Sequence, residues 1–554
     1  MRRAAISALA AIAALALALA ACTPRSTAEG FQPRRTRGVI LISLDTLRAD
    51  HLGCYGYPHP TSPFLDSLAA RGTLFARHVV QIPATLTSHM SIFTGLYPGE
   101  HGVYPPVQVL SPEIPTLPEV FRDHGFRTSG HTEGGWMNGG FGFARGFEDW
   151  SDEPYAADTD VARTLDRGLA FLRGLGDGER FFLFLHTYSI HDPYRPPGEF
   201  RRMFWPGEPP AGVPEPTGEN LVAANQGQLA LPPAALDYYR ALYDASIRYV
   251  DSELERFFAE LESLGLERQV TVMITSDHGE EFREHGKLAH TQVYYENLHA
   301  PLLVINPGQK IGTRVDTITQ TVDLAPTLYE LAGIDGPPVS GESLVPRLRR
   351  AALPSRERAF SEAEIFWGVS KSLVEAGDGR LDQLVFFGRE LGINGFWSTG
   401  EIRFDSFASR LEFQAVTLAE PRAVEVLAGG QPVATLVMPP RWQSYTVDLP
   451  GREGEKRDVV MRSSTCAVPK EIGFADDTRC LSFKLKGMPL DRFELYDLAR
   501  DPLAQQDRSF VDTDRARALL RALAEYRHRS AHPVGKRDLS ESQIRELKAL
   551  GYLQ

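Results

Sequence analysis

The sequence predicts an α/β protein with a mostly parallel central sheet, and three apolar runs carry that prediction. Residues 38–44 (GVILISL), 181–185 (FFLFL) and 269–275 (QVTVMIT) are short, continuous and hydrophobic, as strands buried on both faces are. Helical patterns separate them, notably residues 61–72 and 234–265. Strand, helix and strand in repetition indicate a sheet with helices on both faces.

Polar side chains follow each run at the point where the strand should end. Asp45 follows the first run and His186 the second, and the third leads into Asp277 and His278. Ligand sites of α/β sheets lie beyond the carboxyl ends of the strands. We therefore expect these groups to border one site.

The stretch QIPATLTSHMSIFTG, residues 81–95, predicts a helix that begins close to Thr85. Pro83 stands just before the apolar pattern and Gly95 closes it, which is the usual asymmetry of helix ends. At a helix N-terminus the unpaired N–H groups and the helix dipole favour an anion. The alternative for Thr85 is a plain helix cap.

Asp45, Thr85, Asp277 and His278 together form a candidate metal site. Asp277 and His278 are adjacent in a turn, where they can offer a carboxylate oxygen and an imidazole nitrogen to one cation. An oxygen-rich site with one histidine suits a divalent cation such as Mn²⁺, Ca²⁺, Mg²⁺ or Zn²⁺. Helix capping or a surface position is the alternative for an isolated Asp-His pair.

Changes in composition divide the chain. From about Gly395 the pattern alternates with period two, and AGGQ (residues 428–431) indicates a hairpin, so we expect a β-sandwich-like module. The expected parts are a signal peptide (residues 1–21), a linker (22–37), a catalytic domain (38–390), the β-rich module (395–485) and a tail with helices (486–554).

The N-terminus resembles a bacterial lipoprotein signal. Arg2 and Arg3 precede an apolar run that ends in LAAC, residues 19–22. Cleavage there would leave Cys22 as a lipidated N-terminus, anchoring the protein to a membrane in the cell envelope, on the periplasmic or another extracytoplasmic side. A signal anchor with an incidental cysteine is the alternative. Export would also permit a disulfide, for which Cys466 and Cys480 are the candidates.

The charge balance argues against nucleic acid as a partner. The formal net charge is −12 and no long basic run interrupts the chain.

Seven segments, taken in order, resemble the sulfatase branch of the alkaline phosphatase superfamily. They are VILISLDTLRADHLGCYGY, TLTSHMSIFTGLYPGEHGV, FLFLHTYSIHDPY, TSDHGEEFREHG, YENLHAPLLV, VDLAPTLYELAG and ELYDLARDP. The resemblance covers roughly residues 38–350 and 494–502. It implies an α/β sandwich with a mixed, mostly parallel sheet, a smaller C-terminal subdomain, a divalent cation, and in-line attack on a sulfate or phosphate ester.

The resemblance also implies roles for single residues. It assigns the metal to Asp45, Asp277 and His278, and makes Thr85 the nucleophile and fourth ligand. His191, in IHDPY, matches a histidine that contacts the oxyanion or protonates the leaving group; a loop histidine satisfied by the backbone is the alternative.

Three more side chains are candidates for binding the substrate anion: Arg48, Lys287 and His290. For Arg48, an ion pair with Asp50 is an equal alternative. We expect one metal ion, because the spacings of His186, Asp192, His285 and His290 do not match those of two-metal relatives.

The chain departs from the sulfatase pattern in three places. The C-x-P-S-R signature, whose cysteine becomes formylglycine, is replaced by Thr85 and the four residues after it, and threonine cannot form that aldehyde. The second aspartate of the N-terminal pair is Thr46. The Gly-Lys-x-His element appears as EGGW, residues 133–136, without either cation.

We therefore predict a metal-dependent hydrolase of anionic esters, with phosphate favoured over sulfate. Formylglycine hydrate releases sulfate by collapsing to the aldehyde, an exit that a sulfated threonine lacks, whereas a phosphothreonine can be hydrolysed by water. The alternatives are transfer of a phospho-group to an envelope glycan or lipid, and a degenerate member that binds glycans. A relaxed sulfatase is a further alternative.

Overall fold

The computed structural model describes most of the chain. The described residues are 36–106, 108–153, 161–349, 356–365, 368–377, 380–388, 396–397, 401–406, 408–451, 455–465, 467, 483–486, 492–509, 511–526, 535–536, 539–541 and 544. The expected signal peptide, the candidate lipidation residue Cys22 and the candidate pair Cys466 and Cys480 lie outside them. In the described part of the chain, no helix is both long enough and apolar enough to cross a membrane.

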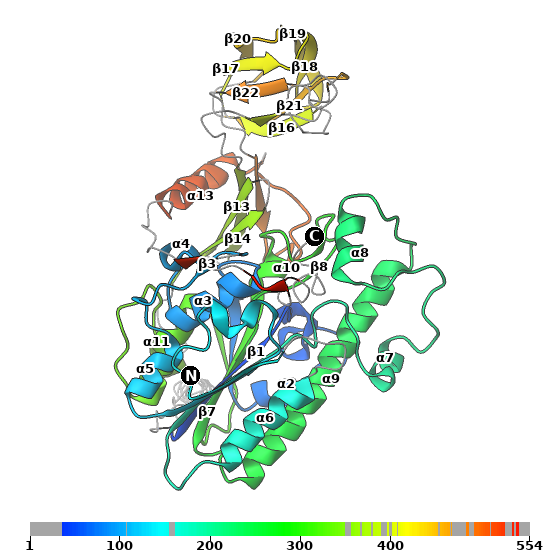
Figure 1. Ribbon diagram of the computed structural model, residues 1–554. Coiled ribbons are helices and arrows are strands. Elements are labelled where there is room, and N and C mark those ends of the chain that lie inside the picture. Colours follow the sequence, from blue (N-terminus) through cyan, green and yellow to red (C-terminus); the bar gives the residue numbers. More distant parts are fainter. Residues whose placement is uncertain are drawn as a thin grey trace, which may run out of the picture.

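An eight-stranded sheet forms the centre of the large domain (Figure 1). Its strands, in spatial order, are β11 (Thr313–Gln320), β2 (Thr73–Val79), β10 (His299–Ile305), β7 (Val270–Thr275), β1 (Gly38–Leu44), β6 (Phe181–Thr187), β4 (Arg127–Thr132) and β5 (Asp149–Asp152). β10 runs antiparallel to both neighbours and the other pairs are parallel. The predicted mixed, mostly parallel sheet is confirmed, and the three predicted strands are neighbours at its centre.

Helices cover both faces of this sheet. The side chains of β1 alternate between two cores: Ile40 and Ile42 join one, and Val39 and Leu41 the other. The first core is completed by α2 (Pro63–Ala69), α6 (Val161–Arg173) and α9 (Ala235–Ser263), and the second by α3 (Thr85–Thr94), α5 (Leu117–Asp123) and α11 (Leu324–Ala332). Each such aliphatic side chain, fully buried, contributes roughly 1.5–3 kcal/mol of transfer free energy.

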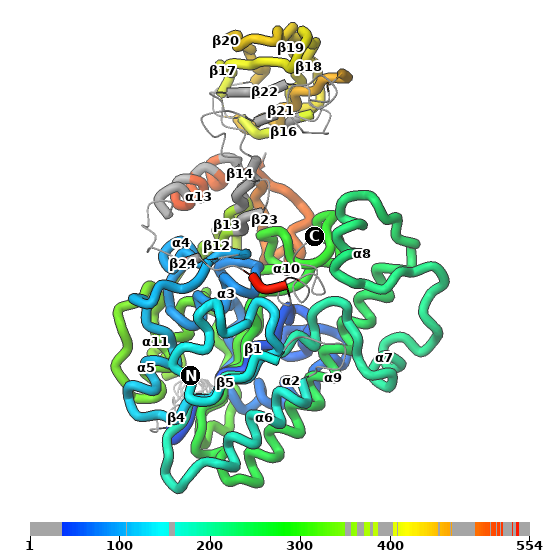
Figure 2. Tube along the Cα trace, viewed as in Figure 1, coloured from blue at the N-terminus to red at the C-terminus, as the bar shows by residue number. Residues whose placement is uncertain are grey.

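A second, antiparallel sheet lies beside the large domain and carries α13 (Thr513–Tyr526). Its strands are β12 (Arg358–Ile365), β13 (Gly368–Gly377), β14 (Arg380–Gly388) and β23 (Arg492–Asp497). Strand β23 belongs to the tail, so the chain returns to this sheet after the β-rich part, as the Cα trace of Figure 2 shows.

Two further four-stranded sheets form the β-rich part, which lies far from the central sheet in Figure 1. Their strands are β15 (Phe396–Trp397), β22 (Phe483–Lys486), β17 (Arg410–Thr417) and β20 (Gln443–Asp448), and β16 (Glu401–Ser406), β21 (Arg457–Arg462), β18 (Arg422–Ala428) and β19 (Gln431–Met438). The predicted hairpin joins β18 to β19 through Gly429 and Gly430, whose φ of 57° and 77° suit a two-residue turn.

The remaining described elements are short. They are η1 (Ala49–His51), η2 (Gly53–Tyr55), α4 (Pro98–His101), β3 (Gln108–Val109), η3 (Gly135–Met137), η4 (Gly139–Phe141), α7 (Gly198–Phe204), α8 (Gly218–Asn225), β8 (Glu281–Phe282), β9 (Leu288–Ala289), α10 (Tyr295–Leu298), η5 (Thr321–Asp323), α12 (Val345–Arg349) and β24 (Gly535–Lys536).

Candidate active site

Three predicted metal ligands meet at the carboxyl edge of the central sheet. β1 and β7 are parallel neighbours with Ser43 beside Thr275, so the residues that follow them emerge side by side. Asp45, Asp277 and His278 each place one ligand atom within 4.8 Å of the others, and all three are fully buried. The sheet register therefore creates the cluster.

His278 is oriented as a metal ligand. Its Nδ1 donates to the carbonyl of Gly279 at 3.0 Å, which leaves the lone pair of Nε2 facing the cluster. That Nε2 lies 3.3 Å from Asp277 Oδ2 and 3.4 Å from Thr85 Oγ1. Burial lowers the pKa of His278 to about 4, so the imidazole is neutral, the form that binds metals.

The two carboxylates of the cluster have oxygens that no described hydrogen-bond donor satisfies, Asp45 Oδ1 and Asp277 Oδ2. Burial and the charge of Asp277 raise the pKa of Asp45 well above its usual value. Burial opposes ionisation of Asp277 too, but surrounding histidines, His278 first, hold its pKa below the usual value. Buried carboxylates at this separation require a proton or a cation between them. The donor set thus fits a divalent cation.

Thr85 is the first residue of α3, and Ala84 occupies the N-cap position. The predicted helix is confirmed: it ends at Thr94, with Gly95 in the left-handed conformation at φ 70°. Ala84 holds the N-cap position, so the cap alternative for Thr85 is not the arrangement observed, and the Thr85 hydroxyl lies 3.4 Å from His278 Nε2, beside the cluster.

The same helix also supports Asp277 through Ser88 and His89, two side chains that the sequence did not predict to be functional. Ser88 donates to the carbonyl of Asp277 at 2.7 Å, and His89 Nδ1 lies 3.6 Å from Asp277 Oδ2. His89 also bonds the carbonyl of Thr85 at 2.8 Å and the hydroxyl of Ser43 at 2.9 Å. The available signal was spacing, since His89 stands one helical turn after Thr85.

Thr46 connects the first strand end to Asp277. Its amide donates to Asp277 Oδ1 at 3.3 Å, and its carbonyl accepts from the hydroxyl of Tyr243 at 2.7 Å. These bonds hold Thr46 at φ 57°, a left-handed conformation that a β-branched residue seldom adopts. Such strain concentrates at functional sites, where the surrounding contacts over-determine it.

His191 lies on the loop after β6, beside His290, whose ring in turn lies beside His278. Its Nδ1 lies 3.0 Å from Asp192 Oδ1, and its ring centre lies 5.1 Å from that of His290. Burial alone would lower the pKa of His191, but the charge of Asp192, aided by Asp45 and Glu280, raises it to about 10. The neighbouring carboxylate of Asp192 therefore favours the imidazolium form of His191.

The three candidates for binding the substrate anion lie in different surroundings. Arg48 is 2% exposed and pairs with Asp50 and Glu284, each at 2.8 Å, so the ion-pair alternative is the arrangement observed. Lys287 donates to the carbonyl of Asn225 at 3.1 Å. His290 does reach the site, with its ring centre 4.4 Å from that of His278.

His186 is held as a support for the first aspartate. Its Nε2 lies 3.0 Å from Asp45 Oδ2, and burial keeps its pKa well below the usual value. The neutral ring thus orients Asp45 without neutralising it.

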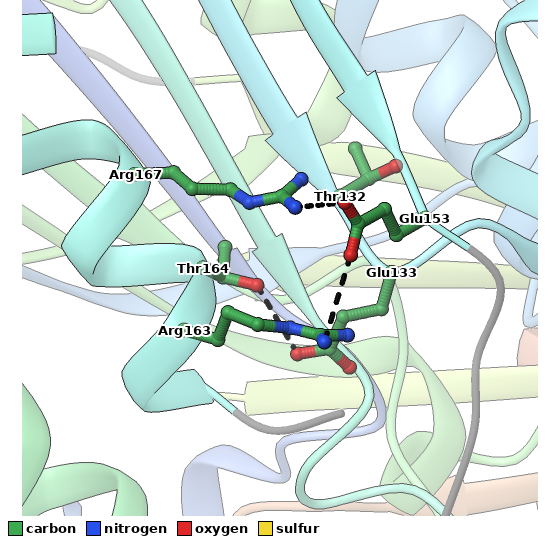
Figure 3. A pocket seen from close by; sticks show the side chains of 6 residues that line it. All are labelled: Thr132, Glu133, Glu153, Arg163, Thr164 and Arg167. Carbon is green, nitrogen blue, oxygen red and sulfur yellow. Dashed lines mark hydrogen bonds and ion pairs between the residues drawn. The ribbon is translucent and has the colours of Figure 1, made fainter. Parts of the chain in front are cut away.

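The EGGW segment replaces the cationic element with an internal carboxylate. Glu133 accepts from the amide of Tyr188 at 2.8 Å and from the hydroxyl of Thr187 at 2.7 Å, which fixes the chain leaving β6. Figure 3 shows Glu133 beside α6, where Arg163 and Arg167 both pair with Glu153.

Gly279 has no room for a side chain. A Cβ there would lie 1.9 Å from the carbonyl oxygen of Glu296. We expect Gly279→Ala to destabilise the fold by about 1–3 kcal/mol through overpacking, measured by urea denaturation. Gly99→Ala is the control, since a Cβ there meets nothing within 4 Å. An equal effect of the two substitutions would contradict the steric argument.

Comparisons with known proteins agree with this geometry. A family model described as Sulfatase matches residues 37–334. Arylsulfatase K of Mus musculus is 24% identical over 405 residues, which cover 64% of this chain and 71% of the mouse protein.

Two solved structures share the fold. One, of a protein in complex with its substrate D-glucosamine-2-N,6-O-disulfate, has a TM-score of 0.60 at 16% identity and covers 89% of this chain and 98% of its own. The phosphonate monoester hydrolase from Silicibacter pomeroyi has a TM-score of 0.51 at 23% identity, covering 63% of this chain and 87% of its own. Because the family match spans more than half of the chain and the fold agrees, this protein belongs to the sulfatase family, the ester hydrolases of the alkaline phosphatase superfamily.

Proposed function

We propose that this chain hydrolyses anionic esters with Thr85 as the nucleophile and one divalent cation held by Asp45, Asp277 and His278. The observation that carries the proposal is the position of Thr85 Oγ1, at the first turn of α3 and 3.4 Å from His278 Nε2. A hydroxyl there shares one buried site with the metal-ligand set. A cation bound there would lower the pKa of the hydroxyl and offset negative charge on the ester.

The first step is in-line attack. The hydroxyl of Thr85 loses its proton to solvent, and its oxygen forms a bond to the phosphorus (or sulfur) of the ester while the bond to the leaving oxygen breaks. His191 gives its proton to that leaving oxygen. Nδ1 of His191 is occupied by Asp192, so Nε2 is the nitrogen that delivers the proton.

The second step releases the acid. Water attacks the phosphothreonine, and the now neutral His191 removes a proton from it. The bond between phosphorus and the Thr85 oxygen then breaks, which leaves His191 as the imidazolium, and the Thr85 oxygen takes a proton back from solvent to restore the hydroxyl. N–H groups at the start of α3 favour the anion in both steps.

We favour phosphate esters over sulfate esters because of this second step. Threonine cannot form the aldehyde through which formylglycine expels sulfate, so release must rely on attack by water at the covalent intermediate. Phosphorus in a monoester permits this attack. The arylsulfatase relatives keep sulfate esters among the substrates to be tested.

A substrate panel tests the proposal. The protein without residues 1–21, loaded with Mn²⁺, Zn²⁺, Mg²⁺ or Ca²⁺, should cleave 4-nitrophenyl phosphate or bis-(4-nitrophenyl) phosphate faster than 4-nitrophenyl sulfate. Turnover of the sulfate alone would refute the phosphate preference. Absence of turnover above a Thr85→Ala background would refute the catalytic role.

The contact between His191 and Asp192 predicts the pH profile. Because Asp192 raises the pKa of His191 to about 10, the general acid stays protonated until pH approaches that value. Asp192→Asn removes the carboxylate, so the alkaline limb of kcat/KM should move to lower pH by roughly 1–3 units. Asp237→Asn, which neutralises an exposed aspartate on α9, should leave the limb in place. An unmoved limb in Asp192→Asn would exclude His191 as the acid.

We also propose that the enzyme works at the membrane surface of the cell envelope, tethered through Cys22. The support is the LAAC pattern after a short apolar run. Cys22→Ala should release the enzyme from the membrane fraction into the soluble fraction, and retention of the variant would exclude the tether.

A further inference from the structure

A second cluster of metal-binding side chains lies just beyond the catalytic loop. Glu281 is on β8, His285 is in the turn between β8 and β9, and Glu296 is on α10. One ligand atom from each lies within 4.8 Å of the other two. Both glutamates are buried, at 0% and 4% exposed, and His285 is partly buried. The proposed catalytic mechanism uses none of them.

His285 is held in the orientation of a metal ligand. Its Nε2 donates to the carbonyl of Ala504 at 2.8 Å, and its Nδ1 lies 2.6 Å from Glu296 Oε1. The ring is stacked on Tyr294 with centres 3.5 Å apart and planes within 5°. Burial would lower the pKa of His285, but its hydrogen bond to Glu296 raises the pKa above the usual value, so Nδ1 carries a proton that a bound cation would replace. The bond from Nε2 to a carbonyl is the one that a ligating histidine usually makes.

The carboxylates of this cluster are only half satisfied. Glu281 Oε1 accepts from Gln292 at 2.8 Å, but Glu281 Oε2 and Glu296 Oε2 are buried without a hydrogen-bond partner among the described residues. Two buried unpaired oxygens each cost desolvation free energy that a cation would offset.

Apart from the pairing of Glu296 with His285, the nearest arginine supplies little positive charge to the two glutamates. Arg48 lies near Glu296, but its guanidinium is engaged by Asp50 and Glu284. Burial and the neighbouring Glu296 raise the pKa of Glu281 well above its usual value. A divalent cation that displaced the Nδ1 proton of His285 would balance Glu281 and Glu296 together, whereas the imidazolium of His285 balances Glu296 alone.

We propose that Glu281, His285 and Glu296 form a second, structural binding site for a divalent transition-metal ion, separate from the catalytic one. The imidazole nitrogen favours Zn²⁺ or Mn²⁺ over Ca²⁺ and Mg²⁺, which take oxygen ligands. This proposal does not depend on the reaction proposed above.

A cavity of about 230 Å³ lies beside the second cluster and is lined by Glu296 together with Pro502 and Leu503 of the tail. The side chain of Glu296 is fully buried, so the carboxylate itself is covered on this side.

The ion would fasten the tail to the loop that carries the catalytic Asp277 and His278. His285 binds Ala504 directly, and Tyr294, stacked on His285, donates to Glu494 of β23 at 2.7 Å. Tyr496 donates to the same carboxylate at 2.6 Å. The second site therefore links the catalytic domain to the sheet that the tail completes.

Metal stoichiometry tests this site. The purified full-length protein, loaded with Zn²⁺ and dialysed, should contain two ions per chain by plasma mass spectrometry. Glu281→Gln and His285→Gln should each contain one, Asp277→Asn should contain one, and Glu281→Gln combined with Asp277→Asn should contain none. Glu284→Gln is the matched control, since it removes a neighbouring charge that pairs with Arg48, and it should retain both ions.

A Co²⁺ absorption spectrum tests the second site without requiring the Glu281 and His285 variants to fold. In Asp277→Asn the second cluster is unaltered, so Co²⁺ should produce visible d–d bands with an equivalence point at one ion per chain. One ion in the wild type and none in Asp277→Asn would overturn the proposal. Unchanged metal content in Glu281→Gln would also overturn it, and would assign a shared proton to the two glutamates instead.

Discussion

Replacing Thr85 by alanine is expected to lower kcat/KM for the best phosphate ester by at least about 10³-fold, because the substitution removes the oxygen that we propose as the nucleophile. Metal content should stay at the wild-type level, since Asp45, Asp277 and His278 remain. The measurement is the initial rate with 4-nitrophenyl phosphate or its diester, alongside metal analysis of the same sample. A decrease of this size with the metal retained would show that Thr85 does more than help to hold the ion.

Two further variants sharpen this test. Thr85→Ser keeps the hydroxyl and should keep activity within about 100-fold of the wild type, while Thr87→Val removes a buried hydroxyl that has no hydrogen-bond partner among the described residues. Thr87→Val should therefore leave the rate almost unchanged. If Thr85→Ala were no slower than Thr87→Val, another group would have to be the nucleophile.

Chelation is expected to lower the stability of the wild type by removing the ion from the proposed catalytic site. Asp45→Asn, which should not bind that ion, should lose no stability from this site. A metal ion at a free concentration 100 times its dissociation constant stabilises the fold by about 2.7 kcal/mol. Asp45→Asn should lose that gain together with activity. In the presence of chelator, Asp45→Asn should be more stable than the wild type. The buried Asp45 lies beside the charge of Asp277, and asparagine removes that repulsion.

Paired thermal unfolding with and without chelator measures this reversal. The second proposed site is present in both proteins, so the difference between them isolates the catalytic ion. Asp50→Asn is a suitable control, because its carboxylate pairs with Arg48 and is 42% exposed. Equal metal-dependent stabilisation of wild type and Asp45→Asn would show that Asp45 is not a ligand.

The central sheet was predictable because its strands are buried on both faces. Runs such as residues 38–44 must be almost wholly apolar to occupy that position, and they leave a strong signal. The antiparallel direction of β10 carries no such signal, since HAPLLVI reads like any buried strand. Strand order depends on contacts between distant segments, which periodicity does not record.

The candidate site was partly predictable for a related reason. Asp45 and Asp277 follow apolar strands directly, so sheet geometry alone brings them together. His89 and Asp192 are candidates only because they contact Asp277 and His191, and those contacts emerge only when distances are known. Glu281, His285 and Glu296 were missed as a set because a hairpin turn and a separate helix must fold together before their ligand atoms meet.

A single substitution, Thr46→Asp, would supply the second N-terminal aspartate without remodelling the main chain. Position 46 already has φ 57°, a conformation that aspartate and asparagine adopt far more readily than threonine. Its amide and carbonyl are fixed by Asp277 and Tyr243 whatever side chain it carries. The substitution would add a carboxylate beside the catalytic cluster and relieve backbone strain in the same step. This chain therefore lacks the second carboxylate of the family pattern, but the backbone conformation at position 46 would accommodate it. A single substitution would be enough to add it.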